Sequence, residues 1–144
     1  MKYKNMPQIG RFLGSEYGRK LHRAGVTADI IIPVPIHAKK EALRGFNQSQ
    51  IIAEGLSERL EIPIDSKSVI RKSFTTTQTR KSRVERWLNV EQIYQVKEPQ
   101  NFEGKTVMVV DDVLTTGATI GTLVDELVNV GVKSISIVTI AAGK

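Results

Sequence analysis

The stretch that decides the fold is VMVVDDVLTTGAT, residues 107–119. Four apolar residues lead into two adjacent acids, Asp111 and Asp112, and a loop rich in threonine follows them. A near-continuous apolar run predicts a strand over residues 105–110 that is buried on both faces, as in a parallel sheet. Because open sheets of this class bind ligands at the carboxyl ends of their strands, we expect both carboxylates at the binding edge.

The loop after the acids predicts a phosphate site. We expect residues 111–119 to form a loop that enters a helix, so that backbone N–H groups and the helix N-terminus together bind an anion. Two carboxylates beside a phosphate cradle suit a phosphorylated sugar, with its hydroxyls and a hydrated Mg²⁺ on Asp111 and Asp112. The alternative is a plain strand–turn–helix connection capped by threonine. The candidate phosphate ligands are Thr115, Thr116, Gly117, Ala118 and Thr119.

Working outward, hydrophobic periodicity predicts one α/β domain over residues 1–144. Helices are expected over 7–24, 49–60 and 120–128, strands over 29–35, 89–96, 105–110 and 132–142, short β segments within 62–71, and a loop over 72–86. The first helix is predicted from apolar residues at helical spacing, namely Ile9, Phe12, Leu13, Tyr17 and Leu21. The strand–loop–helix–strand order from 105 to 142 is a βαβ unit, which implies a mostly parallel central sheet flanked by helices.

Composition excludes several classes of protein. The chain of 144 residues has no cysteine, which excludes disulfide scaffolds, cysteine-bound zinc, iron–sulfur clusters and thiol catalysis. Its two histidines are too few for a histidine-rich metal site. No apolar run approaches the roughly 20 residues of a membrane helix, and the N-terminus lacks a signal peptide pattern, so we expect a cytoplasmic protein without a membrane span.

The net charge of +6 is unevenly distributed. Residues 67–86 carry seven Lys or Arg side chains against the single acid Glu85, whereas residues 98–126 carry six acids against Lys105. A basic loop near an acidic strand end suits a polyphosphate and its metal ion, although a solvated surface loop is the alternative. Trp87, near the end of the basic stretch, is either a core residue or a platform on which a base stacks.

The stretch 107–119 resembles the phosphoribosyl pyrophosphate (PRPP) binding motif of type I phosphoribosyltransferases. Further matches are Pro33-Val34-Pro35, Arg44-Gly45-Phe46-Asn47-Gln48, and Thr77-Gln78 followed by Arg83 and Asn89. Together they resemble the ComF family of competence-associated proteins over essentially the whole chain. The resemblance implies a type I phosphoribosyltransferase-like fold with a flexible hood loop at about 72–86. ComF proteins usually begin with a cysteine-rich zinc-binding segment, and this sequence has no cysteine, so we expect no such module here, either because the protein lacks it or because the chain is a shortened form.

The resemblance also implies roles for individual residues. Asp111 and Asp112 would meet the ribose hydroxyls and the magnesium shell, mostly through water or ligand, and residues 115–119 would wrap the 5′-phosphate. Magnesium and hood cations would stabilise the departing pyrophosphate. The remaining candidates are Pro35, Ile36 and His37 beside the pyrophosphate, Arg44 beside the site, and Arg80, Lys81 and Arg83 in the hood.

Three of these features have plainer alternatives. His37 is either a ligand or proton carrier, or a histidine that is simply hydrogen-bonded within its loop. The segment 44–47 either contacts pyrophosphate or an acceptor, or only forms a turn into the next helix. Gly104-Lys105-Thr106 looks like the end of a P-loop, but Pro99 stands where the first glycine belongs, which argues against an ATPase.

Thr115 bears on the acceptor. Relatives that act on 6-oxopurines place an Asp at this position, where it serves the base as a proton acceptor. A threonine hydroxyl cannot do so at neutral pH, so hypoxanthine–guanine salvage is disfavoured.

Three functions follow as hypotheses. The first is a Mg²⁺-dependent phosphoribosyltransferase that passes the phosphoribosyl group of PRPP to an unidentified nitrogen acceptor and releases pyrophosphate. The second is a competence or DNA-uptake factor that binds single-stranded DNA and keeps the PRPP site as a sensor or vestige. The third is a regulator that binds nucleotide and RNA. The expected partners are PRPP and pyrophosphate, with single-stranded DNA, the competence machinery and a second copy of the chain as further candidates.

Overall fold

A computed structural model of the chain describes residues 6–72, 93–114 and 118–142. Its elements, in chain order, are α1 (Met6–Arg23), β1 (Ile30–Pro33), α2 (Ala38–Arg44), α3 (Gln48–Leu60), β2 (Val69–Arg71), β3 (Tyr94–Val96), the 3₁₀ helix η3 (Pro99–Asn101), β4 (Thr106–Leu114), α5 (Ala118–Asn129) and β5 (Ser134–Ala142). None of the helices within these ranges combines the length and apolar character that spanning a bilayer requires.

The central sheet is parallel, with the strand order β1-β4-β5. Ile30 of β1 pairs with Val107 of β4, and Thr106 of β4 pairs with Ser134 of β5. A single parallel bridge between Ile31 and Ile64 extends the hydrogen bonding on the free side of β1. Strands β2 and β3 form a separate antiparallel ribbon. The α/β class and the mostly parallel sheet predicted from sequence are therefore confirmed.

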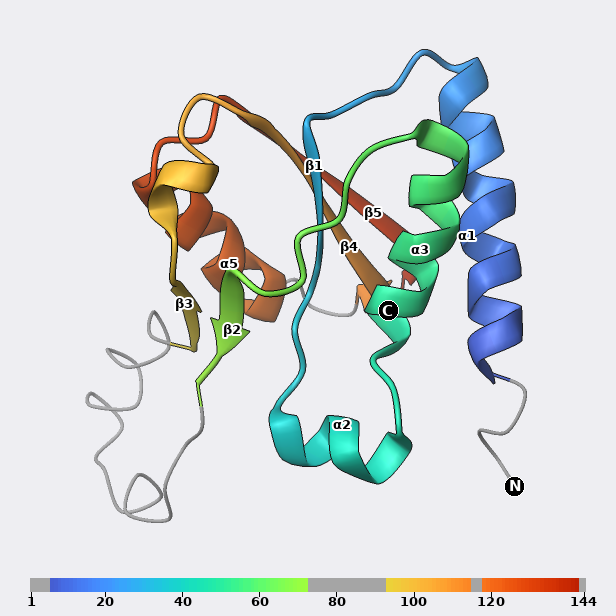
Figure 1. Cartoon of the computed structure of the whole chain (residues 1–144), viewed down its shortest axis with the longest axis horizontal. Helices are drawn as coiled ribbons and strands as arrows, with labels where there is room; N and C mark the ends of the chain where they lie inside the picture. The colour runs from blue at the N-terminus through green and yellow to red at the C-terminus, as the bar shows by residue number, and fades with distance from the viewer. Residues whose placement is uncertain (1–5, 73–92, 115–117, 143–144) are drawn as a thin grey trace.

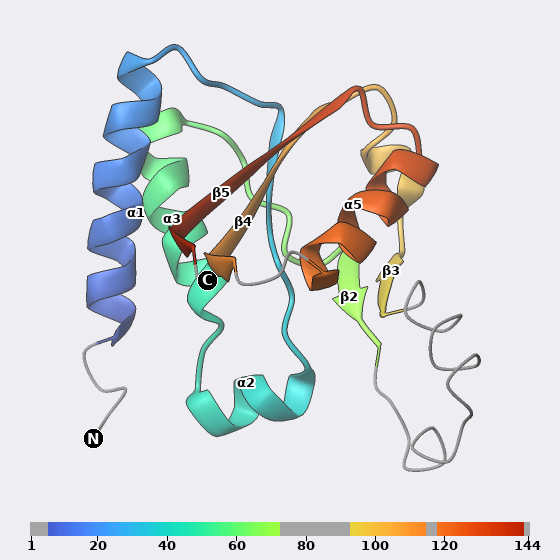
Figure 2. The ribbon, with the colours of Figure 1, turned by 180° about the vertical axis from the view of Figure 1, so that it is seen from behind.

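Helices cover both faces of the sheet (Figures 1 and 2). On one side α5 and the β2–β3 ribbon lie together, and on the other α3 packs against the sheet with α1 outside it. Alternate residues of β4 serve the two sides, because successive side chains of a strand point to opposite faces. Val107 and Val109 belong to the α5-side core, whereas Met108 and Val110 belong to the α3-side core. All four are at most 1% exposed, as the apolar run predicted.

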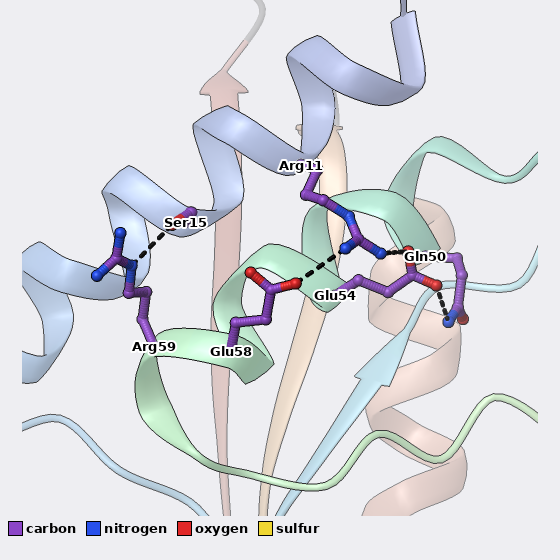
Figure 3. Close-up of polar contacts among 6 residues, drawn as sticks. All are labelled: Arg11, Ser15, Gln50, Glu54, Glu58 and Arg59. Atoms are coloured by element: carbon purple, nitrogen blue, oxygen red, sulfur yellow. Dashed lines mark hydrogen bonds and ion pairs between the residues drawn. The ribbon is translucent and has the colours of Figure 1, made fainter.

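Helix α1 contacts α3 through glycine. A Cβ atom on Gly14 would lie 2.2 Å from the carbonyl oxygen of Ile52, and one on Gly55 would lie 2.3 Å from the carbonyl oxygen of Arg11. The two backbones are therefore too close to admit a side chain between them. Polar pairs flank this contact in Figure 3. Arg11 pairs with Glu54 and Glu58 at 2.9 Å each, and the Arg59 Nε–H donates to Ser15 Oγ at 2.8 Å.

The helix predicted over residues 7–24 is confirmed as α1, although the apolar stripe that predicted it is only partly buried. Ile9, Phe12 and Leu13 are 50%, 63% and 39% exposed, whereas Tyr17 and Leu21 pack against the α3-side core. Glycines at every fourth position, rather than the large apolar residues, form the close contact with α3.

Helix α2 was not predicted, because most of its described side chains are exposed and show no apolar period. Local capping defines it. The Lys39 N–H donates to His37 Nδ1 at 3.1 Å at its start, and Gly45, with φ of 84°, ends it in the left-handed conformation. The segment 44–47 thus forms the turn between α2 and α3.

Substituting Gly14 by Ala is expected to lower the free energy of unfolding by about 2 kcal/mol, because the new methyl group overlaps the backbone of α3. The control is Gly121→Ala in α5, where the added Cβ would meet no atom within 4 Å. That change is expected to raise stability by about 0.5–1 kcal/mol through lower entropy of the unfolded chain. Urea denaturation compares the two variants, and equal unfolding midpoints would contradict the backbone contact.

Candidate functional site

The two acids lie on β4 where β1 has already ended. Pro33, the last residue of β1, pairs with Val110, and Asp111 follows directly. Sequence predicted a loop from residue 111, but β4 continues to Leu114, because β5 pairs with it up to Leu114 and Ala142. Tertiary pairing thus overrides the local loop signal. The carboxylates sit on a strand that is hydrogen-bonded along one side only.

Asp111 is half-buried and held by two donors. The Ser49 hydroxyl donates to Asp111 Oδ1 at 3.3 Å, and the Asp112 N–H donates to the same oxygen at 2.9 Å. Burial, together with the neighbouring Asp112 carboxyl, raises the pKa of Asp111 to about 6. The carboxylate is therefore charged at neutral pH but incompletely stabilised, and a cation or hydrogen-bond donor bound there would stabilise it further.

Asp112 has a different environment. Its Oδ1 accepts a hydrogen bond from the Val113 N–H at 2.9 Å, and its backbone carbonyl accepts one from the Thr139 hydroxyl at 3.2 Å. It also borders a pocket of about 170 Å³ between α1, α3 and the sheet. Most of that lining is apolar, including Leu13 and Ile140.

A polar network from the Asn47 segment reaches Asp111. Asn47 caps α3, because its Oδ1 accepts from the Ser49 N–H at 3.0 Å. Its Nδ2 donates to the carbonyl oxygen of Val34 at 3.1 Å, which ties the start of α3 to the end of β1. Ser49, only 3% exposed, then carries the connection to Asp111. Sequence reasoning missed Ser49, although it stands directly after the Arg44–Gln48 match.

The turn after β1 lies beside a second pocket, of about 200 Å³. Pro35 and Ile36 line it together with Asn47 and Gln50, so two of the residues expected beside pyrophosphate border a cavity. His37 acts as the N-cap of α2. Arg44 is the last residue of that helix and is half-buried.

The other predicted site residues are described only in part. Thr115, Thr116 and Gly117 lie outside the described residues, whereas Ala118 and Thr119 begin α5. The hood candidates Arg80, Lys81 and Arg83, and also Trp87, fall within 73–92 and lie outside the described residues as well. The structure therefore brings together Asp111, Asp112, Ser49 and the Asn47 cap.

The residues present fit a magnesium ion that is carried by its ligand. No group of three or more His, Asp or Glu side chains suited to a metal occurs within the described ranges. Mg²⁺ is usually bound by one or two carboxylates plus the phosphates of a substrate, and keeps several of its waters. The two adjacent carboxylates, Asp111 and Asp112, match that pattern and not a cage made by the protein alone.

The sequence of this chain matches a known domain family and several named proteins. The phosphoribosyl transferase domain family matches residues 47–144. Competence protein F of Haemophilus influenzae is 34% identical over 110 residues, which cover 76% of this chain and 48% of the relative. DNA utilization protein YhgH of Escherichia coli K12 is 32% identical over 109 residues, covering 76% and 47%. Competence protein ComFC of Bacillus subtilis is 34% identical over 91 residues, covering 63% and 35%.

The matched part of this chain thus spans slightly less than half the length of competence protein F and of YhgH.

Solved structures share the fold of this chain. An allosteric regulatory enzyme of purine biosynthesis superposes with a TM-score of 0.63 at 22% identity, covering 95% of this chain and 25% of that one. The purine phosphoribosyltransferase from Pyrococcus horikoshii gives 0.54 at 23% identity, covering 95% and 73%. The expected type I phosphoribosyltransferase fold is confirmed.

Asp111→Asn is expected to stabilise the protein at neutral pH. The pKa of Asp111 is raised when folded, so the folded state binds a proton more readily than the unfolded chain, whose value is about 3.9. Stability therefore falls as pH rises from about 4 to 6, and the penalty is complete above that range. After allowance for solvent screening, we expect a gain on the order of 1 kcal/mol at pH 7.5 that vanishes near pH 4.

The matched control is Asp29→Asn. Hydrogen bonds from the Thr106 N–H and hydroxyl lower the pKa of Asp29, so its charge stabilises the fold at neutral pH and that contribution is lost on acidification. The two variants should thus change stability in opposite directions at pH 7.5. Urea denaturation at a series of pH values measures this, and a destabilised Asp111→Asn would refute the assignment.

Proposed function

The chain belongs to the phosphoribosyl transferase domain family, within which it is a ComF-type member, and we propose that it binds PRPP with Mg²⁺ and transfers the phosphoribosyl group to a nitrogen acceptor. The observation that carries this proposal is the half-buried Asp111 carboxylate, held at the end of the sheet by Ser49 and the Asp112 N–H. A carboxylate with a raised pKa lowers the stability of the folded protein at neutral pH. Such groups are concentrated at functional sites, which supports a ligand-binding role for Asp111.

The ribose is the part of PRPP that suits the two acids. Ionised carboxylates only accept hydrogen bonds, and the 2- and 3-hydroxyls of a ribose present two adjacent donors. In this proposal Asp111 and Asp112 bind those hydroxyls and share the magnesium shell. The Ser49 hydroxyl keeps Asp111 oriented, because its own helix is fixed to β1 by Asn47.

The 5′-phosphate then lies toward the start of α5. This helix begins at Ala118 and has no acidic residue in its first turn, so its N-terminal N–H groups favour an anion. We assign the phosphate to residues 115–119 on this ground and on the resemblance of their motif. The pyrophosphate is assigned to the turn of Pro35, Ile36 and His37 at the end of β1, with Arg44 nearby in the sequence.

Departure of pyrophosphate builds positive charge on the ribose ring and negative charge on the leaving group. When bound, Mg²⁺ supplies positive charge that offsets the charge of the pyrophosphate. The carboxylates of Asp111 and Asp112 lie on the ribose side, where positive charge develops. The cations Arg80, Lys81 and Arg83 are proposed to act on the leaving group and, by closing over the site, to exclude water.

Titration calorimetry tests PRPP binding directly. Wild-type protein is expected to bind PRPP in the presence of Mg²⁺ and at least tenfold more weakly without it. The double variant Asp111→Asn/Asp112→Asn should lose Mg²⁺-dependent binding, because it keeps hydrogen-bonding groups but removes both charges. Product analysis for pyrophosphate release with candidate amines and nucleobases follows once binding is established.

A charge-matched control separates local from general electrostatics. Glu103→Gln/Asp125→Asn removes two negative charges at exposed positions away from the acid pair. This control should bind PRPP at least as well as wild type. Absence of binding in the wild type would refute the proposal, and unchanged binding in the Asp111/Asp112 double variant would refute the site.

A second candidate function is binding of single-stranded DNA. The names of the relatives, competence protein F and DNA utilization protein, favour it together with the net charge of +6. Because the basic stretch 67–86 concentrates cations, it is the segment we propose for the contact. In this alternative the PRPP site is a sensor or vestige.

Salt dependence distinguishes the two functions. A fluorescently labelled oligonucleotide should bind at 50 mM salt, with an affinity that falls with a log–log slope of about −0.7 for each phosphate contacted. Replacing Arg80, Lys81 and Arg83 by Gln should make the salt dependence of DNA binding less steep. The double variant Asp111→Asn/Asp112→Asn should leave it unchanged. Fluorescence anisotropy measures both, and no binding at low salt would exclude DNA as a ligand of this chain.

A further inference from the structure

An apolar pocket beside Asp112 takes no part in the proposed binding of PRPP. It has a volume of about 170 Å³ and lies between α1, α3 and the ends of β4 and β5. In Figure 2 the ends of these two strands lie beside α3, with α1 outside it. The polar residues that line the pocket are Gln48 and Asp112, and the rest of the lining consists of glycine, alanine and branched aliphatic residues.

Large apolar side chains are exposed around this pocket. Ile9 and Leu13 of α1 and Val113 of β4 line it, and all three are exposed. Apolar residues that gather at one place on a surface mark interaction sites, whereas single ones do not. A cavity of about 150 Å³ with an apolar lining binds benzene, so this pocket has the size for an aromatic ring and not for a segment of protein.

The lining also restricts the charge of the ligand. Asp112 is an acid, and no Lys or Arg lines the pocket within the described residues. The Asp112 carboxylate accepts a hydrogen bond from the Val113 N–H, and a carboxylate offers about four acceptor positions, so a ligand can donate another. The Gln48 amide supplies a donor and an acceptor. A neutral ring with an N–H group suits this lining, whereas a carboxylated ring meets the like charge of Asp112.

The pocket lies across the acids from the turn assigned to pyrophosphate. In the strand order β1-β4-β5 the acids are on the middle strand, with the Pro35 turn after β1 on one side and Ile140 of β5 in the pocket wall on the other. Helix α3 contributes to both pockets, since Gln50 lines the one beside the turn and Ile51 lines this one. A nucleophile that displaces a leaving group from a sugar with inversion attacks the opposite face of the ring. The pocket is on the side that this attack requires.

We propose that this pocket binds the nitrogen acceptor, and that the acceptor is a neutral aromatic ring with an N–H group and no carboxylate. The inference rests on the proposed function, because it requires a phosphoribosyl group bound at the two acids. Leu13 and Ile140 contact the ring, and Asp112 and Gln48 orient its nitrogen. A C–N bond forms at the ribose carbon as the C–O bond to pyrophosphate breaks. Pyrophosphate keeps the electron pair of that bond, and the proton of the nitrogen passes to water.

Benzimidazole is the probe, because at pH 7.5 it is a neutral aromatic ring with an N–H group. Titration calorimetry without PRPP should detect its binding to the wild type. The matched probe is benzimidazole-5-carboxylate, which keeps the ring and adds a negative charge. It should bind about tenfold more weakly, because its carboxylate meets the like charge of Asp112.

Leu13→Gln places a polar group in the pocket. It should weaken benzimidazole binding about tenfold, which is typical for the loss of an apolar contact in a binding pocket, and leave PRPP affinity unchanged. The matched control is Val128→Gln on α5, where another exposed apolar residue lies outside the pocket. This control should leave both affinities unchanged. Because both positions are exposed, neither variant should unfold at a markedly lower urea concentration.

Pyrophosphate release links the pocket to the transfer reaction. With PRPP and Mg²⁺, benzimidazole should accelerate release by wild type, and Leu13→Gln should need about tenfold more benzimidazole for the same rate. The acceptor pocket is refuted, and the proposed function stands, if wild type binds PRPP but not benzimidazole, if bound benzimidazole does not react, or if Leu13→Gln binds it as tightly as wild type. If wild type binds no PRPP, the proposed function fails and the acceptor role of the pocket fails with it.

Discussion

The two-sided hydrogen bonding of β4 is the constraint on which the rest of the structure depends. Its first residues pair with β1 on one side and β5 on the other, and four consecutive side chains are buried between the two helical layers. A strand in this position cannot shift register without moving both cores. Asp111 and Asp112 therefore occupy a fixed height relative to the ends of β1 and the start of α5.

Two of the described polar groups lie in unfavourable surroundings. Asp111 is a half-buried acid beside another acid, and Tyr94 is a buried hydroxyl without a partner. Both features lower the stability of the free protein. Elsewhere the described structure is conventional, with capped helices and apolar cores on both sides of the sheet. The unfavourable surroundings of Asp111 in an otherwise well-packed structure are typical of a functional site.

Sequence predicted those parts of the fold that depend on local pattern. The apolar run before Asp111, the helix after Asn47 and the βαβ unit were all recognisable because burial imposes a period on the residues themselves. Contacts between distant segments left weaker signals. The continuation of β4 to Leu114 depends on pairing with β5, and the close contact at Gly14 depends on the backbone of α3.

The candidate site likewise combines features set by local sequence with contacts between distant segments. Its two acids could be predicted, because adjacent carboxylates after a buried strand are unusual. The Ser49 hydroxyl could not, since its relation to Asp111 exists only in three dimensions. The hydrogen bond from Ser49 to Asp111 joins residues 62 positions apart. The hydrophobic periodicity of neighbouring residues does not predict a contact between residues so far apart in the sequence.

The parallel pairing of β1 with β4 also sets the order in which a newly synthesised chain acquires its parts. As the ribosome extends the polypeptide from its N-terminus, α1, β1 and α3 emerge before β4 is translated. The contact between α1 and α3 can form at that stage, but the edge of β1 and the hydroxyl of Ser49 lack their partners until some 60 residues later. The sheet edge that carries Asp111 and Asp112 therefore forms only after β4 has been translated.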